Sequence, residues 1–248
     1  MPFTFSHPAI ILPLGKLPKQ WFSMTCLVIG SMVPDFEYFL RLRVESIYSH
    51  TWLGLIWFDI PLGLLLAFLY QAFIKNNLIE NLPAVLNRRF STFRGTYKDG
   101  TLFQYFTVAV ISISIGAVSH LVWDSFTHPH GYFVTVIPAL SYVVSFGGHQ
   151  LYVFKIIQHS STIIGAIIII AFIASLPQGQ LKRQRNIMWF WMQVAFVSVV
   201  VVSIRLIAGL SWHRYGDILV TAIAGGLLGL LFASLTVYWK TGNKPFDI

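Results

Sequence analysis

Long apolar segments dominate this chain and limit what it can fold into. A helix needs about 20 mostly apolar residues to cross a bilayer, because the hydrocarbon core offers no water to a free backbone. Only 10% of the residues are charged, whereas soluble domains carry roughly 25%. The segments of sufficient length are Trp52–Ile74, Leu102–Phe126, Leu151–Leu176, Ile187–Leu210 and Ile218–Trp239. The sequence therefore predicts an all-α, polytopic membrane helix bundle with about five full spans.

The N-terminal apolar stretches are too short to span. Ala9–Leu14 and Phe22–Val33 form two arms around a turn that is rich in proline and glycine. Such a pair is tolerated at membrane depth only when it is buried in protein. We therefore expect either a re-entrant pair or a half-length helix pair in this region.

A second short stretch, Tyr132–Phe146, is interrupted by Pro138 and closed by Gly147-Gly148. We expect a short helix here, on the outer face of the membrane. No repeat, linker or shift in composition divides the chain, so the sequence predicts one integral-membrane domain over residues 1–248. Residues 1–130 carry its motifs, and residues 151–239 carry three further spanning helices.

Basic residues gather in the connections between the apolar segments, and their placement predicts orientation. The loop after the first span, the 177–187 connection and the C-terminal tail hold Lys75, Arg88, Arg89, Arg94, Lys98, Lys182, Arg183, Arg185, Lys240 and Lys244. We place these segments in the cytoplasm, as in a multi-pass protein of a bacterial inner (cytoplasmic) membrane. The net charge of +8 then reflects topology and contact with membrane lipids. No nucleic-acid partner is expected, because no basic face with interleaved aromatic residues is present.

A stripe of ionisable residues ends the Leu102–Phe126 segment. His120, Asp124 and His128 are each four residues apart, a spacing that keeps side chains along one helix face. Ionisable groups are costly in a bilayer and are usually functional there. Neutral imidazole and carboxylate are ligands for divalent metals, so the stripe predicts a metal site. The alternative is a simple hydrogen bond between His120 and Asp124.

Other ionisable residues fall on the same membrane face in this topology. Asp35 follows Pro34 at the end of an apolar arm, His50 precedes the first span, and His130 follows the stripe. His7 joins them only if the N-terminal arms are re-entrant. Asp35 could instead be a solvated turn residue, and His50 could be an interfacial helix cap. Pro129 disfavours helical geometry at His128.

The motifs MPFTFSHPAIILPL, GSMVPDFEYFLR, SHTWLGLIWFDIPLG and GAVSHLVWDSFTHPHG resemble a bacterial integral-membrane family, domain of unknown function 4184. A more distant likeness reaches the membrane-bound metal-dependent hydrolases. The order of a His, a Pro-Asp, a second His and HxxxD is also similar to zinc-dependent phospholipase C and P1-type nucleases. Those all-helical enzymes use zinc to cleave phosphodiesters. The likeness is one of motif order only.

The resemblance implies a set of metal ligands and a catalytic role for one of them. The metal ligands would be His7, Asp35, His50, His120, Asp124 and either His128 or His130. One or two divalent ions, most plausibly zinc, would act on a phosphoester or lipid head group at the outer membrane face. Asp35 would serve as a bridging ligand or as the catalytic base. The HxxxE pair of the soluble enzymes has no counterpart here, where the later helix offers His149 and His159 without a Glu in that arrangement.

Further ionisable residues support competing functions. Arg205 and Arg214 could hold an anionic head group, and Arg205 could instead pair with Asp217 or Asp59. Asp59 and His159 lie deep in predicted spans, where with Arg205 they could line the pathway of a transporter or channel. A non-catalytic membrane scaffold with a structural metal is the third alternative. The sequence does not indicate an oligomeric state.

Overall fold

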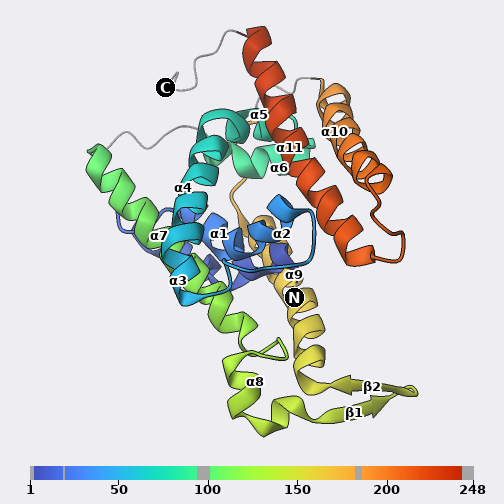
Figure 1. Cartoon of the computed structure of the whole chain (residues 1–248). Coiled ribbons are helices and arrows are strands. Elements are labelled where there is room, and N and C mark those ends of the chain that lie inside the picture. Colours follow the sequence, from blue (N-terminus) through green and yellow to red (C-terminus); the bar gives the residue numbers. More distant parts are fainter. Residues whose placement is uncertain (1–2, 19, 94–100, 182–185, 242–248) are drawn as a thin grey trace. The chain divides into compact units, whose positions relative to one another are not determined.

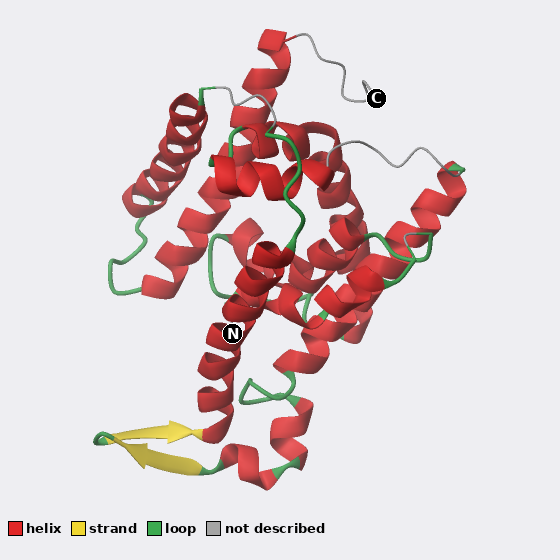
Figure 2. Ribbon diagram, turned by 180° about the vertical axis from the view of Figure 1, so that it is seen from behind, coloured by secondary structure: helices red, strands yellow, loops and turns green. Residues whose placement is uncertain are grey.

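The computed structural model describes residues 3–18, 20–93, 101–181 and 186–241. Within these ranges the chain is helical apart from one β-hairpin (Figures 1 and 2). The elements are α1 (Met24–Met32), α2 (Phe36–Arg41), α3 (Trp52–Gly54), α4 (Ile60–Leu69), α5 (Lys75–Glu80), α6 (Ala84–Phe90), α7 (Leu102–Asp124), α8 (Tyr132–Val136), β1 (Val143–Phe146), β2 (His149–Tyr152), α9 (Val153–Ser175), α10 (Ile187–Ile207) and α11 (Tyr215–Thr241). Short 3₁₀ helices cover Thr4–Ile10, Leu12–Lys16, Val33–Asp35, Ser91–Phe93 and Pro138–Ser141.

The predicted spans are confirmed, with their ends moved by a few residues. Five helices in the described residues are long and apolar enough to cross a membrane: Trp52–Glu80, Leu102–Asp124, Val153–Ser175, Ile187–Ile207 and Tyr215–Trp239. The first one continues six residues past its predicted end, and it contains two π-helical turns, Leu55–Asp59 and Tyr70–Ile74. The protein is therefore an all-α, multi-pass membrane protein.

The chain is organised as two compact units, and each draws on three separated stretches. The first unit contains Met1–Asp35, Tyr48–Leu64 and Thr101–Ala174, and the second contains Phe36–Ile47, Leu65–Gly100 and Ser175–Ile248. All six predicted metal ligands belong to the first unit. One domain over the whole chain remains a prediction. Of the basic residues that set the predicted orientation, Arg94, Lys98, Lys182, Arg183, Arg185 and Lys244 lie outside the described residues.

Two small residues bring α1 and α7 together in the first unit. A Cβ atom on Gly116 of α7 would overlap the Leu27 carbonyl oxygen of α1, and one on Gly30 would overlap the Ile113 carbonyl oxygen. Leu27 and Ile113 are fully buried at this crossing. Small residues allow such close approach of membrane helices. The crossing places His120, one turn beyond Gly116, against the end of α1.

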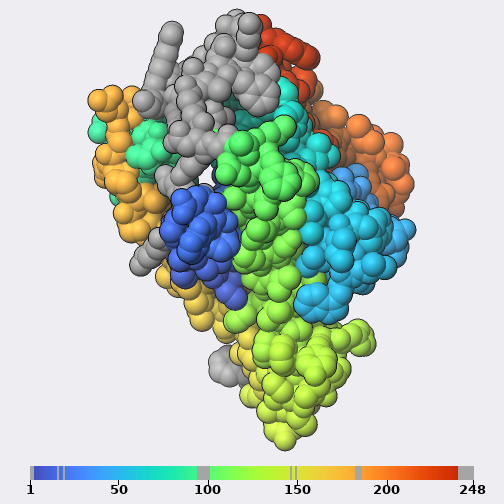
Figure 3. Space-filling view, turned by 90° about the vertical axis from the view of Figure 1, so that its left-hand side faces the viewer, coloured from blue at the N-terminus to red at the C-terminus, as the bar shows by residue number. Residues whose placement is uncertain are grey.

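The N-terminal arms are short, as predicted. The chain forms two 3₁₀ helices before α1, which has nine residues and begins at the Ser23 cap. The first 3₁₀ helix packs on α1 and α7, and the Ser6 hydroxyl donates to the Thr162 carbonyl of α9 at 3.0 Å. Figure 3 shows α7 in green between this N-terminal segment in blue and the start of the Trp52–Glu80 helix in cyan. Whether the arms re-enter a membrane remains a prediction.

The segment between α7 and α9 contains the predicted short helix and, after it, a hairpin that was not predicted. Helix covers only Tyr132–Val136, and after a 3₁₀ turn the chain forms the antiparallel hairpin of β1 and β2. Gly147 and Gly148 have φ of 57° and 81°. Positive φ at both central residues is what a two-residue hairpin turn needs. Pro138 prevents the helix from continuing, and the glycine pair reverses the chain.

The second unit is built around α10 and α11. Gly225 and Gly229 of α11 face α10, because a Cβ on either would lie 2.7 Å from the backbone of Ser198 or Val194. Phe190, Val194 and Ala233 form a buried cluster between the two helices. The small residues therefore serve helix packing here, as in the first unit.

Candidate metal centre

His120 and Asp124 occupy the last two turns of α7 and share one face. The Nε2 atom of His120 lies 3.4 Å from Oδ2 of Asp124. Both residues are buried, at 0% and 6% exposure. The spacing of four residues in the sequence therefore produces the predicted pair.

Asp35 reaches this pair from the 3₁₀ turn that follows α1. Its Oδ1 atom lies 3.5 Å from His120 Nε2, and the residue is fully buried. The other oxygen, Oδ2, accepts a hydrogen bond of 2.6 Å from the Thr4 hydroxyl. Asp35 is thus not a solvated turn residue, which corrects that alternative.

His50 approaches from the start of the Trp52–Glu80 helix. Its Nε2 atom lies 3.5 Å from Asp35 Oδ1 and 3.7 Å from Asp124 Oδ2. The N-cap of that helix is Thr51, whose side chain accepts from the Gly54 N–H. The cap therefore does not account for His50, and its imidazole is directed at the two carboxylates.

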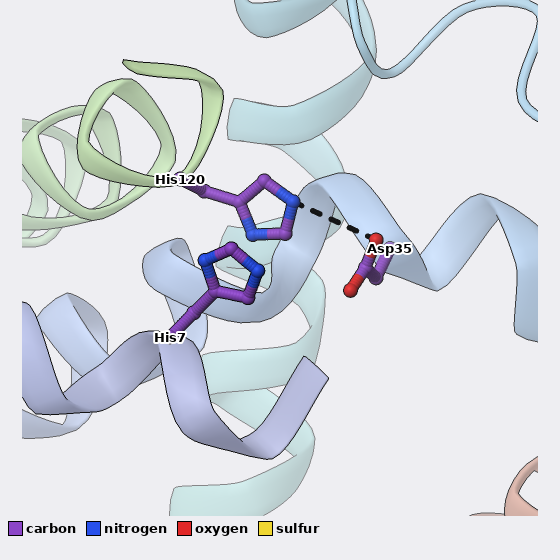
Figure 4. A group of neighbouring side chains, drawn as sticks. All are labelled: His7, Asp35 and His120. Atoms are coloured by element: carbon purple, nitrogen blue, oxygen red, sulfur yellow. Dashed lines mark ion pairs between the residues drawn. The ribbon is translucent and has the colours of Figure 1, made fainter. Parts of the chain in front are cut away.

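His7 completes the group from the first 3₁₀ helix. Its Nε2 atom lies 3.5 Å from Asp124 Oδ1, and its ring stacks on the His120 ring with centroids 3.8 Å apart. Figure 4 shows the two imidazoles beside each other and Asp35 opposite His120. His7 therefore lies in the cluster, and the re-entrant path on which its prediction depended remains a prediction.

Four donor atoms form a closed ring. Going round it, His120 Nε2, Asp35 Oδ1, His50 Nε2 and Asp124 Oδ2 are separated by 3.5, 3.5, 3.7 and 3.4 Å. These separations exceed ordinary N–H···O distances of about 2.7–3.2 Å. They are close to the separation of about 3.3 Å between two ligands that are each about 2.0–2.1 Å from one zinc ion, but no group of more than three described residues has all its ligand atoms within 4.8 Å of one another. Two triplets of side chains satisfy the spacing for a shared ion: His7, Asp35 and His120, and His50, His120 and Asp124.

Several side-chain atoms of the predicted ligands lack hydrogen bonds within the described part of the chain. They are His7 Nε2, Asp35 Oδ1, His120 Nε2 and Asp124 Oδ1, all buried. A buried polar atom without a partner costs about 1–3 kcal/mol. One cation would satisfy several of them at once, so the residues present fit a divalent metal.

Outer contacts orient the ligand side chains. Nδ1 of His120 lies 2.8 Å from the Ser31 carbonyl, so this nitrogen donates and Nε2 is the ring atom that faces Asp35 and Asp124. The Ser49 hydroxyl lies 3.0 Å from His50 Nδ1. Metal-binding histidines usually carry such a partner on the second ring nitrogen.

The protonation states suit metal binding at two of the predicted ligands that lie outside the spans, His7 and Asp35. Burial, and after it the nearby His120 ring, lower the pKa of the His7 imidazole to about 3. Burial alone would raise the pKa of the Asp35 carboxyl, but His120 and His50 outweigh it and hold that pKa below its ordinary value. At a third, His50, burial would lower the pKa of the imidazole, but Asp124 and Asp35 outweigh it and hold that pKa above its ordinary value. Neutral imidazole and ionised carboxylate are the forms that coordinate metals.

His128 and His130 differ in their distance from the centre. His128 Nδ1 lies 3.0 Å from the Asp124 carbonyl oxygen and 3.6 Å from its Oδ2. It belongs to neither triplet found among the described residues. His130 is exposed in the loop after α7. His128 therefore lies at the edge of the centre, and its role as a ligand remains a prediction.

The remaining candidates lie outside both triplets. Asp59 is fully buried at the end of a π-helical turn, His159 is exposed on α9, and His149 begins β2. Arg205 and Arg214 belong to the second unit. Arg214 pairs with Asp217 at 2.7 Å. Their functional roles remain predictions.

Three residues of the centre were missed in the sequence. Thr4, Ser31 and Ser49 each hold a ligand side chain. Ser49 is adjacent to His50, which is a local signal. The contacts of Thr4 and Ser31 depend on how distant segments pack, so no local pattern reveals them.

One family model matches residues 1–235, and it is described as a domain of unknown function (DUF4184). No curated protein and no solved structure matches the chain. The match confirms the predicted family. The likeness to hydrolases rests on the motif order alone.

Proposed function

We propose that this chain, which belongs to the domain of unknown function family DUF4184, is a membrane-embedded metal-dependent hydrolase. Its metal would be a divalent ion, with zinc as the first choice, and one or two ions would be bound. The proposed ligands are His7, Asp35, His50, His120 and Asp124. The proposed substrate is a phosphoester or a lipid head group.

The ring of donor atoms is the observation that carries the metal proposal. Segments far apart in the chain direct imidazole and carboxylate atoms to one point, at 3.4–3.7 Å from each other. A histidine–aspartate hydrogen bond would explain a pair, but it does not explain a closed ring of two imidazoles and two carboxylates. One or two cations held by the two triplets would explain the ring, because each triplet brings three ligand atoms within 4.8 Å of one another.

A divalent ion in this centre would supply Lewis-acid chemistry, polarising a phosphoryl or acyl oxygen and activating water. The side chains have separate tasks. Asp35 is held by Thr4 through one oxygen and directs the other at His120 and His50. This arrangement favours the ligand role over that of a free general base. Hydrolysis is chosen because the order of the motifs is similar to that of zinc-dependent phosphodiesterases.

Access to the centre is one-sided. The side chains of His50 and His128 are 22% and 29% exposed, whereas those of His7 and His120 are at most 1% exposed. A substrate would therefore approach between His50 and His128. We place this opening at the outer face of a bacterial inner membrane, because Asp124 ends α7 opposite the basic connections.

Metal content of the full-length protein in detergent tests this proposal. We expect at least one equivalent of zinc or another transition metal by elemental analysis, and its loss in a His120→Ala/Asp124→Ala variant. His159→Ala is the matched control, since His159 is exposed and lies outside both triplets. A folded protein that takes up no added divalent metal would exclude the centre.

Activity is tested separately, on phospholipid vesicles and on a chromogenic phosphodiester. We expect release of head group or chromophore by the metal-loaded protein, and loss of that release in Asp35→Asn. If the protein binds metal but hydrolyses neither substrate, the hydrolase function is excluded and the non-catalytic scaffold with a structural metal is favoured.

A further inference from the structure

The connection between α7 and α9 has an unusual composition. Residues 125–154 contain no Asp, Glu, Lys or Arg, and Lys155 is the first such residue after Asp124. The stretch carries three tyrosines, Tyr132, Tyr142 and Tyr152. A connection that lay in water would normally carry charge.

The apolar side chains of this connection are exposed. Tyr132 is 67% exposed and Tyr142 is 63% exposed, and Val136, Val143 and Val144 lie above 40%. Val143 and Val144 are neighbours on β1, so their side chains point to opposite faces of the hairpin. Each face of the hairpin therefore carries an exposed valine, although Ser145 and Gln150 are also part of the hairpin.

A hairpin of this kind is unsuited to water. The sheet has only two strands, β1 and β2, and an isolated two-stranded hairpin is marginally stable in water. It is equally unsuited to the hydrocarbon core, because the open edges of the two strands leave backbone groups unpaired. The interface between head groups and acyl chains satisfies both requirements, since it covers apolar side chains and still hydrates the backbone.

The flanking spans place the connection at this depth. Helices α7 and α9 have 23 residues each, or about 35 Å at 1.5 Å per residue. The hydrocarbon core is about 30 Å thick. Because α7 ends at Asp124 and α9 begins at Val153, both ends of the connection lie within about one turn of the membrane boundary. Tyrosines are enriched at that boundary.

We propose that residues 125–152 form a lipid-binding surface in the membrane interface and present phospholipids to the candidate metal centre. The occupant is phospholipid of the same bilayer. Asp124, a member of the centre, is the residue directly before this surface, and His128 lies within it at the open edge. The substrate class is then a phospholipid head group, a step that rests on the proposed function.

A second copy of the chain is the competing occupant. The apolar surface continues into the lipid-facing sides of α7 and α9, which are candidate spans. Lipid must already cover exposed residues of those helices, such as Ile163 and Ile167. Continuity with that covered surface favours lipid over a second copy.

Fluorescence quenching in nanodiscs of phosphatidylcholine and phosphatidylglycerol tests the surface. An environment-sensitive label is attached at Val144→Cys and, as a second site, at Tyr142→Cys. We expect strong quenching by a nitroxide on the lipid head group and weak quenching by aqueous iodide. Ile167→Cys is the deep control and Glu45→Cys the aqueous control. The only native cysteine, Cys26, is buried, so the wild-type chain measures background labelling.

Two results would contradict the proposal that this surface binds lipid. Iodide quenching equal to that of Glu45→Cys would place the hairpin in water. Shielding from both quenchers, with cross-linking between chains at position 144, would assign the surface to a second copy. Either result leaves the metal measurement intact, so the two proposals can fail separately.

The proposed phospholipid substrate is tested by a separate kinetic measurement. Tyr142→Glu and Val144→Glu should raise the KM for vesicle phospholipid and retain bound metal, because they disturb the surface and not the ligands. An unchanged KM in both variants would contradict presentation of lipid by this surface. Wild-type protein that binds metal but does not hydrolyse vesicle phospholipid would overturn the assigned substrate.

Discussion

The hydroxyl of Thr4 donates a hydrogen bond of 2.6 Å to Oδ2 of Asp35, and this leaves Oδ1 directed at His120 and His50. Thirty-one residues of sequence separate the two partners. The bond divides the carboxylate into one oxygen that is held by the protein and one that faces the centre. Such outer contacts set the orientation of metal ligands.

Replacing Thr4 by valine should therefore weaken metal binding without removing a ligand. Valine keeps the shape of threonine but cannot donate, so Asp35 loses its anchor. Loss of an outer partner typically lowers metal affinity about 10–100-fold, and competition with a chromogenic chelator measures the change. Thr107→Val is the control, because Thr107 is half-buried on α7 and its hydroxyl donates to the Phe103 carbonyl of the same helix. Equal affinities in wild type and Thr4→Val would contradict this role.

Metal should also stabilise the fold, because the ligands come from segments that are distant in sequence. A ligand that binds only the folded state stabilises it by about 2.7 kcal/mol at 100 times its Kd. We expect zinc to raise the temperature of thermal unfolding and a chelator to lower it. Asp35→Asn should abolish this zinc-dependent shift, whereas His130→Ala should retain it. A shift that survives in Asp35→Asn would place the stabilising ion elsewhere.

The sequence allowed the spans and the His120–Asp124 pair to be predicted, because each follows from a local period. The length of an apolar segment indicates a membrane span, and a spacing of four residues places two side chains on the same face of a helix. The approach of His7, Asp35 and His50 was inferred from topology and resemblance, since no local period connects them. The partner of His120, Ser31, depends on the crossing of α1 and α7, which is decided by Gly30 and Gly116 together.

The hairpin was not predicted, although its signal was present. Gly147-Gly148 follows Val143 and Val144, and a Gly-Gly pair between two strand-forming runs indicates a two-residue hairpin. The short helix predicted within Tyr132–Phe146 is present at Tyr132–Val136, but the apolar content of the stretch did not indicate that a strand follows. Pro138 and the glycine pair together outweigh that apolar content, because they fix the backbone where a helix cannot continue.

The predicted orientation of the chain in the membrane can be tested independently of the metal. If the basic connections are cytoplasmic, a cysteine at position 130 should react with a membrane-impermeant reagent from outside intact cells. A cysteine at position 185 should react only after the membrane is opened. The reverse pattern would move the candidate centre to the cytoplasmic face and leave its geometry unchanged.

Close packing of α1 and α7 should be necessary for the centre. In Gly116→Ala the new methyl group would overlap the Leu27 carbonyl and lie 2.5 Å from the Ser31 nitrogen, so the helices must separate. Overpacking of this kind costs about 1–3 kcal/mol. The separation would also pull His120 from the Ser31 carbonyl, so metal affinity should fall together with the unfolding temperature.

Variants at two glycines of the second unit distinguish the loss of stability from the loss of metal affinity. A Cβ on Gly229 would lie 2.7 Å from the Val194 carbonyl, whereas one on Gly226 meets nothing within 4 Å. Gly229→Ala should therefore lower the unfolding temperature of the metal-free protein and keep its metal affinity, and Gly226→Ala should change neither. Chelator competition and thermal unfolding measured on all three variants give the comparison. If Gly116→Ala lost stability but kept full metal affinity, the crossing of α1 and α7 would not be what positions His120.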